Sequence, residues 1–313
     1  MNELRNAAEK AADDQVDLVS LQWTLRQPRS FFSYAMSLAT GLATVAAMFP
    51  LFSVLYLLAV RGGRQLGLAA FTDLPPAAMM PGGGFGNAIV GTIVIVAIAT
   101  LISVPVGILA AIYVAEFGPE TRTAAAVRFA AKVLTGLPSI LAGVFAFAVV
   151  VMTTREFSAP AGGVALALLM LPTVLLTAEE AIKRVHPRMR EAAIGMGASP
   201  TQVVTKVILP TAMPNILTGV MLAIARAAGE TAPLIFTALF SEYWISSSSP
   251  EFLPKSMGDL MKPTASLAVL IYNFSGSPFD NQINLAWAAA LVLVILVLFT
   301  NIAGQSLARR SDR

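Results

Sequence analysis

The chain has 313 residues, of which 56% are hydrophobic and 12% charged, and its mean hydropathy is +0.73. Soluble domains carry about 25% charged residues, so the composition indicates an integral membrane protein and excludes an ordinary soluble domain. The chain has no cysteine, which excludes disulfides, thiolate nucleophiles and Cys-ligated metal sites. The net charge is +3, but in a membrane chain the placement of the charges says more than their sum.

Apolar stretches of about 20 residues recur along the chain, which is the length that crosses roughly 30 Å of hydrocarbon. The pattern predicts an all-α integral membrane protein with six transmembrane helices. We place them at residues 34–60, 88–115, 130–152, 163–179, 215–241 and 284–304.

The segments outside these spans complete the predicted organisation. Residues 1–33 form a polar tail without the basic start and small-residue cleavage site of a secretory signal, so we expect the tail to stay on the chain. Residues 61–87 form a Gly/Pro-rich loop, and residues 305–313 form a C-terminal tail. The apolar run 265–274 is too short to cross, so we expect a buried or re-entrant segment there.

The basic residues are unevenly divided between the two sides of the predicted membrane. Of the 21 Lys and Arg residues, 15 fall in the two tails and in the connections after the second and fourth spans, and five fall on the other side. By the positive-inside rule, both termini are cytoplasmic and the Gly/Pro-rich loop is periplasmic.

The cytoplasmic connection at residues 186–210 contains signals for two short helices. Pro187 suits the first turn of a helix, where its missing N–H costs nothing, and the run that follows favours a helix. Glycine readily takes the left-handed conformation that closes a helix, so we expect the first helix to end at Gly195 or Gly197.

A second helix is predicted directly after this glycine turn. Ser199 is placed to cap it, Pro200 occupies its first position, and Gln202 follows three residues after the cap, which makes a capping box. We expect this helix to end near Pro210, because Pro214 follows closely. The result is a pair of short helices at the membrane surface.

The same connection resembles the EAA loop of ABC importer permeases, whose pattern is Glu-Ala-Ala, three residues, Gly, nine residues, Ile, one residue, Leu-Pro. The matching residues are Glu191, Ala192, Ala193, Gly197, Val207, Leu209 and Pro210, with Val207 in place of the usual Ile. In that family the loop docks into a groove on an ATP-hydrolysing subunit. The resemblance implies a type I ABC importer permease fold, with residues 88–304 as the permease domain and residues 186–210 as its coupling loop.

Three further stretches narrow the resemblance to the PstA-type permeases of phosphate importers: PVGILAAIYVAEF (105–117), TGLPSILAGVFAF (135–147) and ARAAGETAPLIFTA (225–238). Sister PstC-type permeases and importers of sulfate or molybdate are the alternatives within the family. The resemblance implies a bacterial inner-membrane permease for phosphate. It also implies an ATP-hydrolysing partner, expected as a dimer, a second PstC-like permease subunit and a periplasmic phosphate-binding protein.

Arg226 and Glu230 are charges inside an apolar stretch. If the predicted span enters near Asn215, Arg226 lies about 16 Å deep and Glu230 about 22 Å, near mid-membrane. A charge at that depth costs about 2.5–3.5 kcal/mol, so both side chains must face protein or water. Their spacing of four puts them on one helical face, where they can pair.

Two interpretations of this pair remain open. In one, the charges form a neutralised packing contact, or pair with charges on a partner helix. In the other, Arg226 donates to an oxyanion in the translocation path, and Glu230 keeps the site from holding that anion too tightly. Glu230 could also accept a hydrogen bond from a protonated phosphate oxygen, which sulfate lacks.

Other classes of function lack their sequence features. The chain has no G-x-x-x-x-G-K-[ST] motif, so ATP hydrolysis is expected on a separate chain, and no catalytic residue, cofactor or nucleic-acid partner is predicted. A self-contained secondary transporter would show repeated halves, and an intramembrane enzyme would need a reactive cluster at depth. His186, the only histidine, has no second His or Cys nearby to hold a metal, and Glu116 is expected to be a solvated helix terminus.

Overall fold

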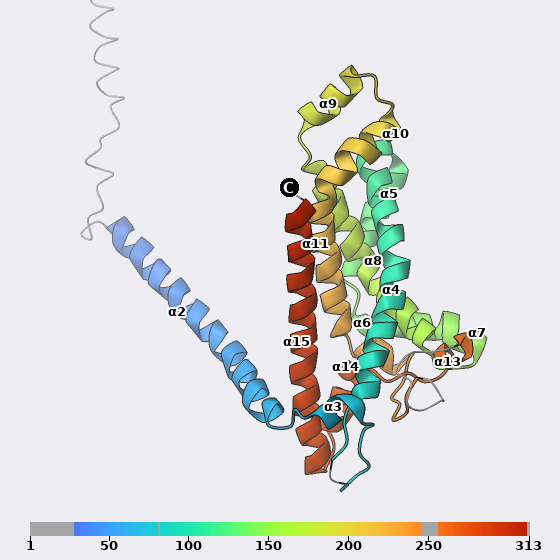
Figure 1. Ribbon diagram of the computed structural model, residues 1–313. Coiled ribbons are helices and arrows are strands. Elements are labelled where there is room, and N and C mark those ends of the chain that lie inside the picture. The colour runs from blue at the N-terminus through green and yellow to red at the C-terminus, as the bar shows by residue number, and fades with distance from the viewer. Residues whose placement is uncertain (1–27, 81, 246–255, 312–313) are drawn as a thin grey trace, which may run out of the picture. The chain divides into compact units, whose positions relative to one another are not determined.

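The computed structural model of the chain describes residues 28–80, 82–245 and 256–311 (Figure 1). Within these ranges the regular elements are all helices. The chain forms two compact units, residues 1–56 and 57–313. Most of the predicted N-terminal tail lies outside the described residues, and residues 28–33 are already helical.

The described part of the first unit is helix α2 (Pro28–Leu57). With the π-helical turn η1 (Leu58–Gly62) that follows, it gives an apolar helix long enough to cross a membrane, from Phe31 to Gly62. The predicted first span lies inside this helix. The hydroxyls of Thr40 and Thr44 each donate to the carbonyl four residues earlier at 2.8 Å, so these groups need no partner from lipid.

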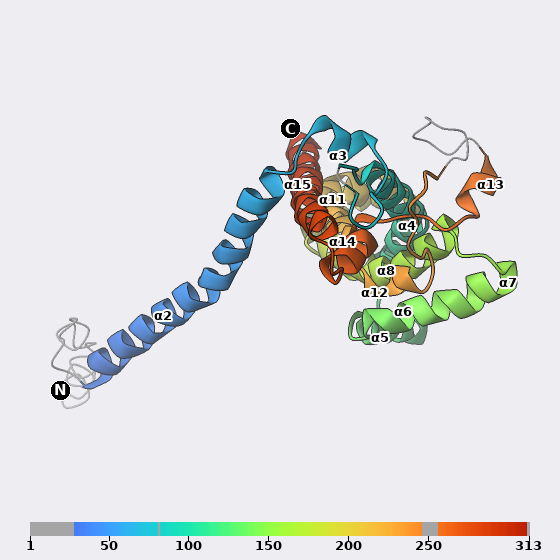
Figure 2. The ribbon, with the colours of Figure 1, turned by 90° about the horizontal axis from the view of Figure 1, so that it is seen from below.

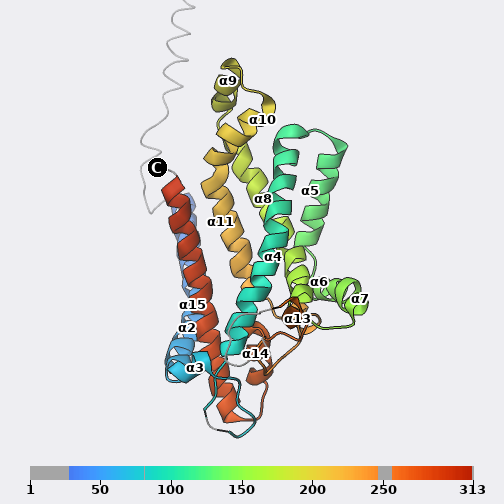
Figure 3. The same ribbon diagram turned by 45° about the vertical axis from the view of Figure 1, so that its right-hand side comes forward.

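The second unit is built on long helices that stand side by side (Figures 1 and 3). They are α4 (Gly86–Ile112) with its π-helical end η2 (Tyr113–Phe117), α8 (Ala159–Lys183), α11 (Leu209–Ala228) and α15 (Asp280–Ser311). Helix α8 contacts both α4 and α11, and α11 contacts α15. Of the candidate spans, α8 is the most buried, which makes it the centre of the packing.

The third predicted span, residues 130–152, is wrong as a single straight helix. Residues Arg122–Thr135 form α5, and Ser139–Thr154 form a second helical stretch made of α6 (Ser139–Ala146), η3 (Phe147–Val151) and α7 (Met152–Thr154). The two stretches are bent by 107°, and seen from below, α6 and α7 run out to one side of the upright helices (Figure 2). Pro138 causes the break, because it disfavours the helical conformation of the residue before it.

Small residues let the long helices approach closely. A Cβ at Gly107 of α4 would lie 2.8 Å from Val174 Cγ1 of α8, and a Cβ at Gly219 of α11 would lie 2.3 Å from the Thr177 hydroxyl of α8. Membrane helices associate through such close packing, since apolar side chains gain little by leaving lipid. The glycines therefore fix the α4–α8–α11 arrangement.

The run 265–274 forms the short helix α14 (Leu267–Ser275), which is buried over much of its length, as predicted. The Leu267 N–H donates to the Thr92 hydroxyl of α4 at 2.9 Å. A Cβ on Gly91 would lie only 1.9 Å from the Ala265 carbonyl oxygen, so backbone meets backbone at this point. The remaining short helices at this end are α3 (Leu68–Thr72), α12 (Ala232–Ile235) and α13 (Met257–Leu260).

This close approach gives a stability prediction. Gly91→Ala should lower the apparent midpoint of thermal unfolding in detergent, because overpacking a well-packed site costs about 1–3 kcal/mol. Gly195→Ala is the matched control, since a Cβ there meets no atom within 4 Å. Equal midpoints for the two variants would contradict the packing described for α4 and the segment before α14.

Candidate functional site

The first helix of the predicted coupling loop is α9 (Pro187–Gly195), with the bounds expected from the sequence. His186 caps it, because its Nδ1 accepts the Arg188 N–H at 3.1 Å. Gly197 follows with φ of +85°, the left-handed conformation predicted for the turn. Within the described residues, no group of three or more His, Cys, Asp or Glu side chains is placed to hold a metal ion.

The second helix begins as predicted at α10 (Pro200–Val203). The Ser199 N–H donates to Gln202 Oε1 at 2.9 Å, and the Gln202 N–H donates to Ser199 Oγ at 3.4 Å, which completes the capping box. The expected end near Pro210 is wrong, because the helix continues through η4 (Val204–Ile208) into α11. A π turn already departs from the regular bonding that a proline would interrupt, so the helix runs past Pro210 without ending.

The residues of the EAA pattern divide into an exposed set and a buried set. Glu191, Ala192, Gly197 and Pro210 are exposed, whereas Val207 and Leu209 are partly buried and Ala193 is 2% exposed. Three large apolar side chains beside them face solvent: Met189, Ile194 and Met196 are 41%, 62% and 82% exposed. Clustered exposed apolar side chains mark contact surfaces, and the pattern match alone did not single out these three.

Arg190 ties this loop to the membrane helices. Its Nη2 donates to Glu116 Oε1 at 2.7 Å and to the Ile182 carbonyl oxygen at 3.0 Å. The Glu116 side chain is 14% exposed and paired, so the expectation of a solvated helix terminus is wrong. The sequence could not show this partner, because Glu116 and Arg190 are 74 residues apart.

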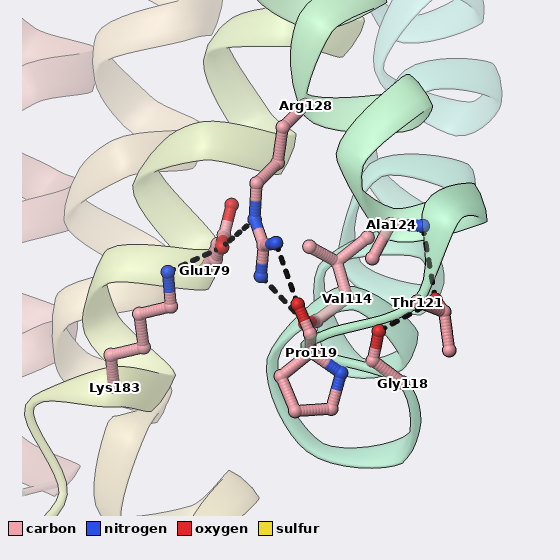
Figure 4. A network of polar contacts seen from close by, with 8 residues as sticks. All are labelled: Val114, Gly118, Pro119, Thr121, Ala124, Arg128, Glu179 and Lys183. Carbon is pink, nitrogen blue, oxygen red and sulfur yellow. Dashed lines mark hydrogen bonds and ion pairs between the residues drawn. The ribbon is translucent and has the colours of Figure 1, made fainter.

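A second charge network clamps the neighbouring ends of α4, α5 and α8 (Figure 4). Arg128 Nε and Lys183 Nζ both lie 2.6 Å from Glu179 Oε1, and the Glu179 side chain is 5% exposed. The Arg128 guanidinium also donates to the carbonyl oxygens of Val114 and Pro119 at 2.9 Å each. Arg128 thus joins α5 to α8 and to the loop that follows α4.

Arg226 and Glu230 are in contact, but the helix that carries Arg226 ends before Glu230. Arg226 Nε lies 3.5 Å from Glu230 Oε1. Helix α11 stops at Ala228 with Gly229 as its cap, so the prediction of a continuous span to residue 241 is wrong. The chain turns here into α12, where Pro233 lacks the N–H that a continuing helix would use.

Packing against α8 places Arg226 at half the height of that helix. The chain from α11 into α12 runs antiparallel to α8, since Gly219 of α11 lies against Thr177 and Leu234 of α12 lies against Gly162. Arg226 is seven residues beyond Gly219, or about 10 Å further along, which is level with the middle of α8. Its side chain is nevertheless 56% exposed within this chain.

A groove of about 430 Å³ between α8 and α11 leads away from this position. It reaches Leu222, one turn before Arg226, at one end. Its polar lining comes from both helices: Thr177, Glu180 and Arg184 of the α8 side, with Asn215 and Thr218 of α11. Polar side chains therefore line the groove from Thr177 and Thr218 to the end of α8 that carries Lys183, next to the coupling loop.

Comparison with known proteins relates most of the chain to one family of transporters. Residues 103–313 match the family described as "Binding-protein-dependent transport system inner membrane component". A phosphate transport system permease protein PstA of Yersinia pestis is 38% identical over 280 residues, covering 90% of each chain. Its counterpart of Haemophilus influenzae is 40% identical over 261 residues, covering 83% of this chain and 88% of the relative.

Solved structures support the same fold. A chain of a bacterial alginate ABC transporter superposes with a TM-score of 0.59 at 17% identity, covering 90% of this chain and 95% of that one. A chain of the MetNI methionine ABC transporter in an inward-facing conformation gives 0.54 at 20% identity, covering 72% and 94%. The chain belongs to the binding-protein-dependent transport system inner membrane components and, within that family, to the PstA-type permeases.

Proposed function

We propose that this permease imports inorganic phosphate as one subunit of an ATP-driven complex. The observation that carries the proposal is the match, at 37–40% identity over 80–90% of the chain, to several curated permeases that are all phosphate transport proteins of the PstA type. ATP hydrolysis belongs to a partner chain, since this sequence has no phosphate-binding loop motif. A PstC-like permease subunit and a periplasmic phosphate-binding protein complete the complex.

The coupling loop supports the orientation predicted from the sequence, because the proposed ATPase partner would bind it from the cytoplasm. The C-terminal end of α15 lies at the same end of the unit as α9 (Figure 1), which supports a cytoplasmic C-terminus. The turn η1 packs at the opposite end of α15, where a Cβ on Gly62 would lie 2.6 Å from the Trp287 carbonyl oxygen. The N-terminus is proposed to be cytoplasmic as well, on the distribution of basic residues.

Arg226 is the residue we assign to the phosphate path. Its side chain is half-exposed at mid-membrane height, and lipid contact would cost about 2.5–3.5 kcal/mol, so it faces water or a partner subunit. The planar guanidinium can donate two parallel hydrogen bonds to a phosphate. The carboxylate of Glu230, 3.5 Å away, competes for those donors and limits how long the anion is held.

The α8–α11 groove extends this path to the cytoplasm. Its polar residues are on the surface of this chain, so a second permease subunit facing the groove would enclose an aqueous route. In the competing structural role, Arg226 pairs permanently with a carboxylate of that second subunit and never meets the anion.

The transported anion can be tested directly. The chain, reconstituted in vesicles with its ATPase, its partner permease and its binding protein, should take up phosphate only when ATP is supplied. Sulfate and molybdate should not be taken up under the same conditions. Uptake of either of these anions in place of phosphate would assign the chain to a different oxyanion importer.

The role of Arg226 gives a second prediction. Arg226→Ala and Glu230→Gln should both assemble, and Arg226→Ala should slow phosphate uptake at saturating binding protein at least about tenfold, since a hydrogen bond to a charged group contributes about 1.5–3 kcal/mol. Arg64→Ala, at an exposed arginine in the loop after η1, is the control and should transport normally. Wild-type uptake by both path variants would show that the pair is only structural.

The groove can be mapped with cysteine, because the natural chain contains none. Thr218→Cys in the groove should react with a membrane-impermeant charged thiol reagent, and phosphate should slow the reaction during turnover. Leu298→Cys, on a 56% exposed apolar position of α15, should stay unreactive because we expect this position to face lipid. Equal reactivity at the two positions, or none at Thr218→Cys, would show that the groove is not part of the phosphate path.

A further inference from the structure

The coupling loop is attached to the membrane helices by more than the chain on either side of it. Covalently, α9 and α10 connect to α8 and α11. The Arg190 side chain adds a third attachment, because its Nη2 contacts both Glu116 at the end of α4 and the Ile182 carbonyl oxygen near the end of α8. One guanidinium therefore holds three segments together.

This ion pair is partly buried. The side chains of Arg190 and Glu116 are 26% and 14% exposed, and their contact is short, at 2.7 Å. Exposed ion pairs stabilise proteins little, whereas removing one partner of a buried pair leaves the other without compensation. The pair is thus suited to hold α9 against the end of α4.

The packing around the pair is incomplete. A cavity of about 230 Å³ lies between the loop and the end of α4, with lining residues that include Phe117, Ile194 and Pro200. Arg190 Nε is buried and has no hydrogen-bond partner among the described residues. Close packing transmits displacement, and the cavity interrupts it beside the pair, so the ion pair provides a direct connection between α9 and the end of α4.

The helices next to the pair have irregular turns. The end of α4 is the π-helical η2, and the π-helical η4 lies between α10 and α11. Such turns are frequent at functional sites in helices. Arg128 holds the same corner from the other side, through its bonds to the carbonyl oxygens of Val114 and Pro119 (Figure 4). A displacement of Glu116 therefore reaches α5 and, through Glu179, α8.

We propose that Arg190 and Glu116 form a coupling strut, which carries the movement of the docked loop into α4 and from there into the phosphate path. The proposal rests on the function proposed above and assigns these two residues a positioning role. Helix α4 packs tightly on α8 at Gly107, so a shift of α4 alters the helix that lines the groove. Without the strut, the ATPase would still hydrolyse ATP, but the membrane helices would move less in response, and less phosphate would be transported per ATP.

The test compares transport with hydrolysis in the reconstituted complex with its binding protein. Glu116→Gln should leave assembly and ATP hydrolysis near normal while the phosphate transported per ATP falls at least about fivefold, the lower end of typical coupling between sites. Arg190→Lys keeps the charge but loses the two-point contact, so the ratio should fall to an intermediate value. The exchange Glu116→Arg with Arg190→Glu should restore part of it. Glu120→Gln, on an exposed carboxylate nearby, is the matched control.

Two results would overturn the strut. One is an unchanged ratio in an assembled Glu116→Gln complex. The other is a parallel loss of hydrolysis, assembly and thermal stability in Glu116→Gln and Arg190→Lys alike, which would indicate a brace for folding only. If the wild-type complex transports a different oxyanion, the phosphate assignment fails, but the same ratio measured with that anion still tests the strut.

Discussion

The absence of hydrogen-bond partners in the hydrocarbon core is the constraint on which the whole structure depends. Backbone groups must be satisfied within the chain, so every spanning segment is a helix. Side-chain hydroxyls follow the same rule: Thr100 and Thr177 donate to carbonyl oxygens four residues earlier, at 2.7 and 2.8 Å. Because apolar burial gives membrane helices little attraction, contact between α4, α8 and α11 relies on glycines that let the backbones approach.

The same constraint makes the placement of charge informative. At the coupling end, Glu179 pairs with Arg128 and Lys183, and Glu116 pairs with Arg190. Both arginines also donate to backbone carbonyl oxygens. Arg226 differs, because its contact to Glu230 is long, at 3.5 Å, and its side chain is 56% exposed. The short ion pairs of Glu179 and Glu116 suit a structure that transmits movement from the loop to the helices. The loosely paired Arg226 suits a site that binds an anion and releases it.

Local signals in the sequence were reliable where neighbouring residues decide the conformation. The start of α9 at Pro187, the turn at Gly197 and the capping box of Ser199 were all predictable, because each depends on bonds within a few residues. Hydropathy failed at bends: residues 130–152 and 215–241 are mostly apolar, yet the helices break near Pro138 and after Ala228. The mean hydropathy of a window does not show whether the helix bends within that window.

The sequence by itself determined that the chain is a helical membrane permease with a two-helix coupling loop, since composition, span length and the Glu-Ala-Ala pattern are properties of neighbouring residues. It also identified Arg226 and Glu230 as charges that lipid cannot accept. Only the tertiary structure decided which groups meet: Arg190 with Glu116, Arg128 with Glu179, and α8 with α11 along a groove that has polar residues on both helices. These partners are far apart in the chain, so their contact depends on how the helices pack and not on the local sequence.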